Sequence, residues 1–167
     1  MMDFGLLIIR LIIGITFMGH GAQKLFGWFG GYGLKGTGGW MESIGLRPGV
    51  FMAFMAGATE LLGGFLFASG IFIVVGSLFI VGTMLMAIFT VHGKNGYWVT
   101  QNGYEYNLML IAVAVGVALI GPGAYVYFNF YLKFEILEKR TYFITIEVSS
   151  FYETKYYFQQ DFLIVIL

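Results

Sequence analysis

The chain has 167 residues, of which 59% are hydrophobic and 11% are charged, and its formal net charge is zero. Soluble domains carry about a quarter charged residues, so this surface cannot be mainly exposed to water, and the composition indicates an integral membrane protein. The absence of cysteine excludes disulfides, thiol catalysis and thiolate metal sites in this chain, and the lack of a basic block excludes a typical nucleic-acid partner.

Four apolar stretches are long enough, or nearly so, to cross a bilayer as helices. They are residues 4–26, 49–67, 71–91 and 106–120, of which the last is the shortest. The turn sequence "ASG" separates the second stretch from the third, and "GPG" at 121–123 ends the fourth. We therefore predict an all-α fold for residues 1–124, namely a transmembrane four-helix up-down bundle with multi-pass topology.

The C-terminal tail, residues 125–167, differs in composition from the rest of the chain. It contains no Gly, Ala, Pro, Met or Trp, and it carries half of the charged residues. This abrupt change predicts a divergent segment outside the bundle. Two interpretations stay open, a cytosolic or interfacial appendage and a tail read in another frame.

Polar side chains gather at one predicted end of the bundle. In an up-down arrangement, the end of the first span, the start of the second, the end of the third and the start of the fourth share one side. These segments carry His20, Gln23, Lys24, Arg47, His92, Lys94, Glu105 and Asn107. We therefore expect a polar mouth there, with a short interfacial helix near Trp40 in the first loop.

Two charges lie deeper in the predicted spans. Glu60 is about eleven residues into the second span, roughly 16 Å at helical rise, and Arg10 is roughly 25 Å from the mouth. Small residues share the helical face of Glu60, which predicts that it faces the interior. Because an unpaired charge at mid-bilayer is costly, we expect Glu60 to pair with Arg10, with His20 or with both. Such a pair either locks two helices together or takes part in function.

Few other residues indicate a specific chemistry. His20 and His92 are the only histidines, and axial ligation of haem requires them at matched depth, whereas His92 is predicted nearer the surface. Two histidines without cysteine do not make a typical zinc site, and we predict no metal. Lys24 either contributes to a site or extends its ammonium to the membrane interface. Met84 and Met86 are interpreted as packing residues.

Four ordered motifs resemble the DoxX family of small bacterial and archaeal membrane proteins. They are "HGAQKLFGWFGG" (20–31), "GATELLGG" (57–64), "GYEYNLML" (103–110) and "GPG" (121–123). The resemblance implies a four-helix bundle in the cell membrane and an oxidoreductase role. Related proteins are associated with quinones, either as a thiosulfate:quinone oxidoreductase subunit in some archaea or in resistance to quinone or catechol stress in some bacilli. The tail departs from the family pattern, in which the chain usually ends soon after the GPG-like turn.

From this resemblance and from the polar mouth we predict an integral membrane protein that is a component of a quinone-linked oxidoreductase or protects against quinone stress. The candidate catalytic residues are His20, Lys24, Glu60 and Glu105, and the candidate binding residues are Arg10, His20, Gln23, Tyr106 and Asn107. The expected partners are membrane lipid, a quinone and a redox partner subunit. Because the sequence contains no recognisable redox centre, an enzyme would need a bound cofactor or such a partner subunit. The alternative is a non-enzymatic membrane scaffold, or a carrier for a small apolar solute.

Overall fold

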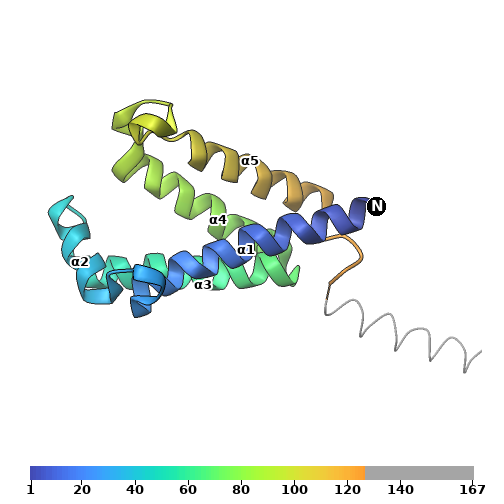
Figure 1. Ribbon diagram of the computed structural model, residues 1–167, viewed down its shortest axis with the longest axis horizontal. Coiled ribbons are helices and arrows are strands. Elements are labelled where there is room, and N and C mark those ends of the chain that lie inside the picture. The colour runs from blue at the N-terminus through green and yellow to red at the C-terminus, as the bar shows by residue number, and fades with distance from the viewer. Residues whose placement is uncertain (127–167) are drawn as a thin grey trace, which may run out of the picture. The chain divides into compact units, whose positions relative to one another are not determined.

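A computed structural model describes residues 1–126, and all statements below refer to this part of the chain. Its elements are helical throughout (Figure 1). They are α1 (Met2–Phe26), η1 (Trp28–Gly30), α2 (Gly33–Ser43), α3 (Gly49–Ser69), α4 (Ile73–Ala87), η2 (Ile88–His92), η3 (Gly93–Asn95), η4 (Val99–Gln101) and α5 (Glu105–Ile120). The tail predicted from residue 125, apart from its first two residues, lies outside the described residues.

The four predicted apolar stretches all form helices, and three of them are long enough to span a bilayer. These three are α1, α3 and the continuous helical segment Ile73–Asn95. α5 has 16 residues, which is fewer than the 20 or so that a hydrocarbon core about 30 Å thick requires. The all-α prediction is therefore confirmed for the described residues. The short helix predicted in the first loop is also present, as α2.

α1 and α3 are antiparallel and pack closely through glycines. A Cβ atom on Gly14 would lie 2.5 Å from the carbonyl oxygen of Gly64, and one on Gly21 would lie 2.7 Å from that of Gly57. Any larger residue at these crossings would push the two backbones apart. The small-residue face predicted on α3 is thus the face that meets α1.

The remaining helices extend this pair, with α3 against α4 and α4 against α5. Figure 1 shows α4 and α5 close to α1 and α3 near the N-terminus of α1, and diverging from them toward α2. We call the first of these the closed end and the second the open end. All four long helices contribute to one hydrophobic core, which includes Leu6, Phe17, Phe67, Ile80, Ala114 and Val117.

Arg10 does not pair with Glu60, so this expectation was wrong. The Arg10 side chain is buried and donates hydrogen bonds to three carbonyl oxygens, those of Pro122, of Ala68 at 3.3 Å and of Tyr125 at 2.7 Å. Side chains on a helix lean toward its N-terminus, and for α1 this direction leads to the closed end. The carbonyl of Ala68 is one of the last four of α3, which have no partner within the helix. Arg10 therefore joins the end of α3 to the segment that follows α5.

Candidate functional site

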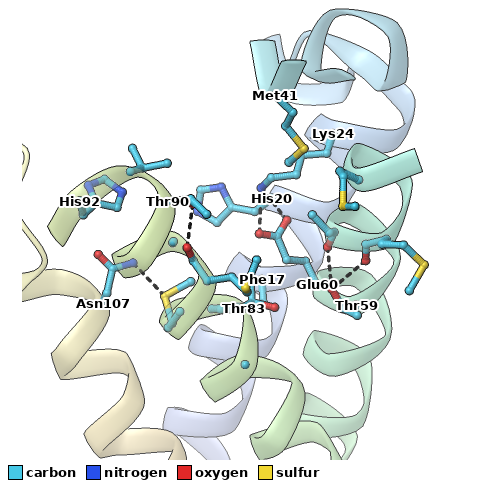
Figure 2. Close-up of a pocket in the computed structure, with 18 of the residues that line it drawn as sticks. Phe17, His20, Lys24, Met41, Thr59, Glu60, Thr83, Thr90, His92 and Asn107 are labelled. Atoms are coloured by element: carbon cyan, nitrogen blue, oxygen red, sulfur yellow. Dashed lines mark hydrogen bonds and ion pairs between the residues drawn. The ribbon is translucent and has the colours of Figure 1, made fainter. Parts of the chain in front are cut away.

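A cavity of about 710 Å³ lies at the open end, with walls from α1, α2, α3, α4 and α5 (Figure 2). Its lining is mostly apolar, and it includes five of the nine methionines, Met41, Met52, Met55, Met84 and Met86. Methionine side chains are flexible and polarisable, so they adapt to irregular or planar ligands. The volume falls within the usual range for sites that bind small organic molecules.

Lys24 and Glu60 form an ion pair on one wall of the cavity. The Lys24 Nζ atom lies 2.8 Å from Oε1 and 2.6 Å from Oε2 of Glu60. The Glu60 side chain is 6% exposed and that of Lys24 is 26% exposed. Because each side chain leans toward the N-terminus of its own helix, and α1 and α3 are antiparallel, the two side chains lean toward each other. The prediction that Glu60 faces the interior is confirmed, but its partner is Lys24.

His20 also lines this wall, and the glycine-rich segment after α1 holds it in place. The His20 Nδ1 atom lies 3.2 Å from Oε1 of Gln23, and Nε2 of Gln23 donates to the Phe29 carbonyl at 3.2 Å. Phe29 has φ 52° and ψ 35°, a left-handed conformation that is uncommon for a bulky residue. Gly31 lets the chain pass close to α1 at Gln23, because a Cβ on Gly31 would lie only 2.6 Å from the Cβ of Gln23. Gln23 itself does not line the cavity.

The opposite wall carries a second polar group of residues. Nδ1 of His92 lies 2.8 Å from the Asn102 carbonyl oxygen, which also accepts from Asn95 Nδ2 at 3.1 Å. Asn107 is buried, and its Nδ2 donates to the Met84 sulfur at 3.3 Å. Figure 2 shows His92 and Asn107 on the other side of the cavity from Lys24 and Glu60. The polar mouth predicted from span order therefore has two separate walls.

The other predicted site residues lie in different places. Tyr106 lines the cavity and is half exposed. Glu105 does not line it, and its Oε2 accepts a hydrogen bond from the Val99 backbone N–H at 3.0 Å, within the loop before α5. Arg10 lies at the closed end. Within residues 1–126, no group of three or more His, Cys, Asp or Glu residues is placed to hold a metal ion.

Sequence reasoning missed two kinds of lining residue. One is the methionine set, since Met84 and Met86 were interpreted as packing residues only. The other is a set of threonines whose hydroxyl groups donate to carbonyls of their own helices at 2.7–2.8 Å, namely Thr59, Thr83 and Thr90. Helical spacing places Thr83 and Thr90, seven residues apart, on one face of the third span. That spacing is the signal that would have found them.

The comparisons with known proteins agree with the resemblance seen in the sequence. The DoxX family profile matches residues 5–93. A protein of Bacillus subtilis (strain 168) named "Putative oxidoreductase CatD" is 35% identical over 120 residues, which is 71% of this chain and 81% of that protein. No solved structure matches the chain.

Proposed function

The chain belongs to the DoxX family, and we propose that it is a multi-pass protein of the cell membrane that binds a quinone in the cavity at its open end. Its role is that of a component in quinone-linked oxidoreduction or in protection against quinone stress. The oxidoreductase part is supported by the printed name of the Bacillus subtilis relative, with which the chain shares 35% identity.

The outward faces of the helices support the membrane location. Large apolar side chains are exposed along α1, α3 and α4, and examples outside the cavity are Ile12, Ile15, Phe54, Phe65 and Val74. Exposed apolar faces of this extent favour contact with lipid tails. We propose that α1, α3, α4 and α5 all cross the bilayer as an up-down bundle. α5 spans about 24 Å at helical rise, so residues that flank it must complete its path.

The combination of apolar walls and a few fixed polar groups carries the quinone proposal. A quinone is a flat, apolar ring with oxygens on its rim, and its binding requires apolar surface and a small number of placed polar groups. Methionine and aromatic side chains supply the surface, while the Lys24–Glu60 pair and His20 lie on one wall and His92 on the other. His20 and Glu60 are suited to exchange protons with the bound ring. Since the chain has no cysteine, we place the electron donor on a bound cofactor or a partner subunit.

Tryptophan fluorescence provides a direct test of quinone binding. Of the three tryptophans, Trp40 lines the cavity, whereas Trp28 and Trp98 do not. Titration of the purified protein in lipid nanodiscs with a short-chain benzoquinone should quench the emission to saturation. The saturable part should disappear in Trp40→Phe, because the remaining tryptophans lie outside the cavity.

Two glycines offer an occluding variant and a matched control. A Cβ on Gly82, in the cavity lining, or on Gly116, outside it, would meet nothing within 4 Å. Gly82→Phe should occupy part of the cavity and weaken quinone binding by ~10-fold or more, a loss of about 1.4 kcal/mol, while Gly116→Phe should bind normally. Equal binding by both variants would refute the cavity as the quinone site. Binding without any effect on quinone sensitivity in cells, and without flavin or haem absorption, would favour the carrier or scaffold alternative.

A further inference from the structure

Both imidazoles that line the cavity are hydrogen-bonded through Nδ1 to groups that can only accept. The Asn102 backbone carbonyl lies 2.8 Å from Nδ1 of His92. For His20 the acceptor is Oε1 of Gln23, whose orientation is fixed because its NH₂ group donates to the Phe29 carbonyl. A carbonyl oxygen has no proton to give, so the proton of each neutral imidazole must lie on Nδ1. Each Nε2 then carries a lone pair and accepts hydrogen bonds.

Several other polar groups of the cavity also present acceptor atoms. Nδ2 of Asn107 donates to the Met84 sulfur, which leaves the Oδ1 atom as an acceptor. The threonine hydroxyls donate to carbonyls of their own helices, so each presents oxygen lone pairs. Lys24 directs two of its three N–H bonds at Glu60. The donors left on the lining of residues 1–126 are the third N–H of Lys24, the second N–H of Asn107, the indole N–H of Trp40, the phenol of Tyr106 and the amide of Asn102.

We propose that the cavity selects the reduced member of the quinone couple, a hydroquinone with two ring hydroxyls. This inference rests on the proposed function, and it adds the redox form of the ligand. The two oxygens of a quinone only accept, so a bound quinone leaves the Nε2 atoms of His20 and His92 without a donor, whereas the hydroxyls of a hydroquinone donate to them. A buried donor without an acceptor, or a buried acceptor without a donor, weakens binding because its lost hydrogen bond to water is not replaced. Gln23 and Asn102 are positioning residues, because they fix which imidazole nitrogen carries the proton.

Calorimetry with a matched ligand pair tests the selection. The protein in nanodiscs is titrated under anaerobic conditions, at about pH 8 where an ordinary imidazole is neutral, with a tailless benzoquinone and with its hydroquinone. Two additional hydrogen bonds, each of about 0.5–1.5 kcal/mol, predict ~10-fold tighter binding of the hydroquinone. Tighter or equal binding of the quinone would overturn the selection and leave the proposed function intact. Absence of binding by both ligands would overturn both.

Nuclear magnetic resonance of ¹⁵N-labelled histidine shows which ring nitrogen carries the proton, and it does so without ligand. The chain has only two histidines, and His92→Gln assigns their signals. Both rings should be in the Nδ1–H form, whereas free histidine in water favours the Nε2–H form. Finding the Nε2–H form for both rings in the unaltered protein would overturn the proposal, whether or not any variant folds.

Variants of Gln23 then separate positioning from mere structural support. Gln23→Leu removes the acceptor, so His20 should shift toward the Nε2–H form and the preference for hydroquinone should fall. Gln23→Glu keeps an acceptor for Nδ1–H and should keep the Nδ1–H form. The control is Gln101→Leu, at an exposed position outside the cavity. It should change neither the tautomer of His20 nor the preference for hydroquinone. A Gln23→Leu protein that binds hydroquinone with unchanged preference would show that Gln23 does not position His20.

Discussion

Replacing Glu60 with glutamine should destabilise the protein, because the ammonium of Lys24 would keep its charge and lose its counter-ion. Both carboxylate oxygens lie within 2.8 Å of Nζ, and the Glu60 side chain is only 6% exposed. Removing one partner of a fully buried pair costs about 3–5 kcal/mol. Lys24 is 26% exposed toward the cavity, and partial hydration should reduce the loss to about 2–3 kcal/mol.

Thermal unfolding in mild detergent measures this loss, and a midpoint lower by about 5–10 °C is expected. The double variant Lys24→Met, Glu60→Gln removes both charges and should recover most of the loss. Glu42→Gln is a control for the removal of a carboxylate, because Oε1 of Glu42 accepts only a backbone hydrogen bond, from Gly49 N–H at 3.0 Å, which the amide can replace. A double variant no more stable than Glu60→Gln would refute the ion pair as the source of stability.

The same variants show whether Glu60 only holds α3 against α1 or also exchanges protons with the ligand. If Glu60 only locks α3 to α1, the double variant should regain quinone-dependent protection in cells together with its stability. If Glu60 also exchanges protons with the ligand, the double variant should be stable and still lack protection, since neither methionine nor glutamine titrates. A Glu60→Gln protein that keeps both stability and protection would refute both roles.

Three further predictions concern the closed end, the α1–α3 contact and the topology. Arg10→Met should lower the unfolding midpoint more than any exposed substitution, because it leaves the buried Ala68 carbonyl without this donor, at about 1–3 kcal/mol, and removes the donor of the partly buried Pro122 and Tyr125 carbonyls; an unchanged midpoint would contradict this. Gly14→Leu should separate α1 from α3 and prevent stable extraction, whereas Gly19→Leu, where a Cβ meets nothing within 4 Å, should be tolerated. Cysteines placed at Lys35 and Lys94 should react with a membrane-impermeant reagent from the same side, and labelling from opposite sides would refute the up-down topology.

The sequence was sufficient to predict the helices and the polar end, because both follow from long-range patterns. Apolar runs of this length form helices in lipid whatever their tertiary contacts, and span order alone placed His20 and His92 toward one end. The small-residue face of α3 was also predictable from the sequence, since Gly57 and Gly64 recur at helical spacing. The length of α5 was anticipated for the same reason.

The ion-pair partners were wrong because axial position was counted from Cα atoms alone. By that count Glu60 lies between Arg10 and His20, and Lys24 is farther away. The side chains of α1 lean toward its N-terminus, which brings the ammonium of Lys24 toward Glu60 and takes the guanidinium of Arg10 away from it. This correction was available from the sequence, once the direction of each span had been assigned.

The hydrogen bonds that hold His20 were not predictable in the same way. They depend on a left-handed Phe29, with φ 52°, in a segment where Gly27, Gly30 and Gly33 also have positive φ, which glycine adopts far more readily than phenylalanine. A bulky residue in this region costs about 1–3 kcal/mol and persists only where surrounding contacts determine it. Here the contact is the hydrogen bond from Gln23 to the Phe29 carbonyl. This strain is not confined to the proposed site, because Phe72, which precedes α4 at the closed end, is also left-handed with φ 49°.

The separation of the two ends has a consequence for how variants should behave. Arg10 and its carbonyl partners act on stability at the closed end, and they share no contact with His20 or Gln23 at the open end. Effects at distant sites without shared partners are usually additive within about 0.3–0.5 kcal/mol. Arg10→Met combined with Gln23→Leu should therefore show the sum of two stability losses, with the ligand preference of Gln23→Leu alone. Coupling larger than about 1 kcal/mol between them would mean that closure of the helices at one end controls the geometry of the cavity at the other.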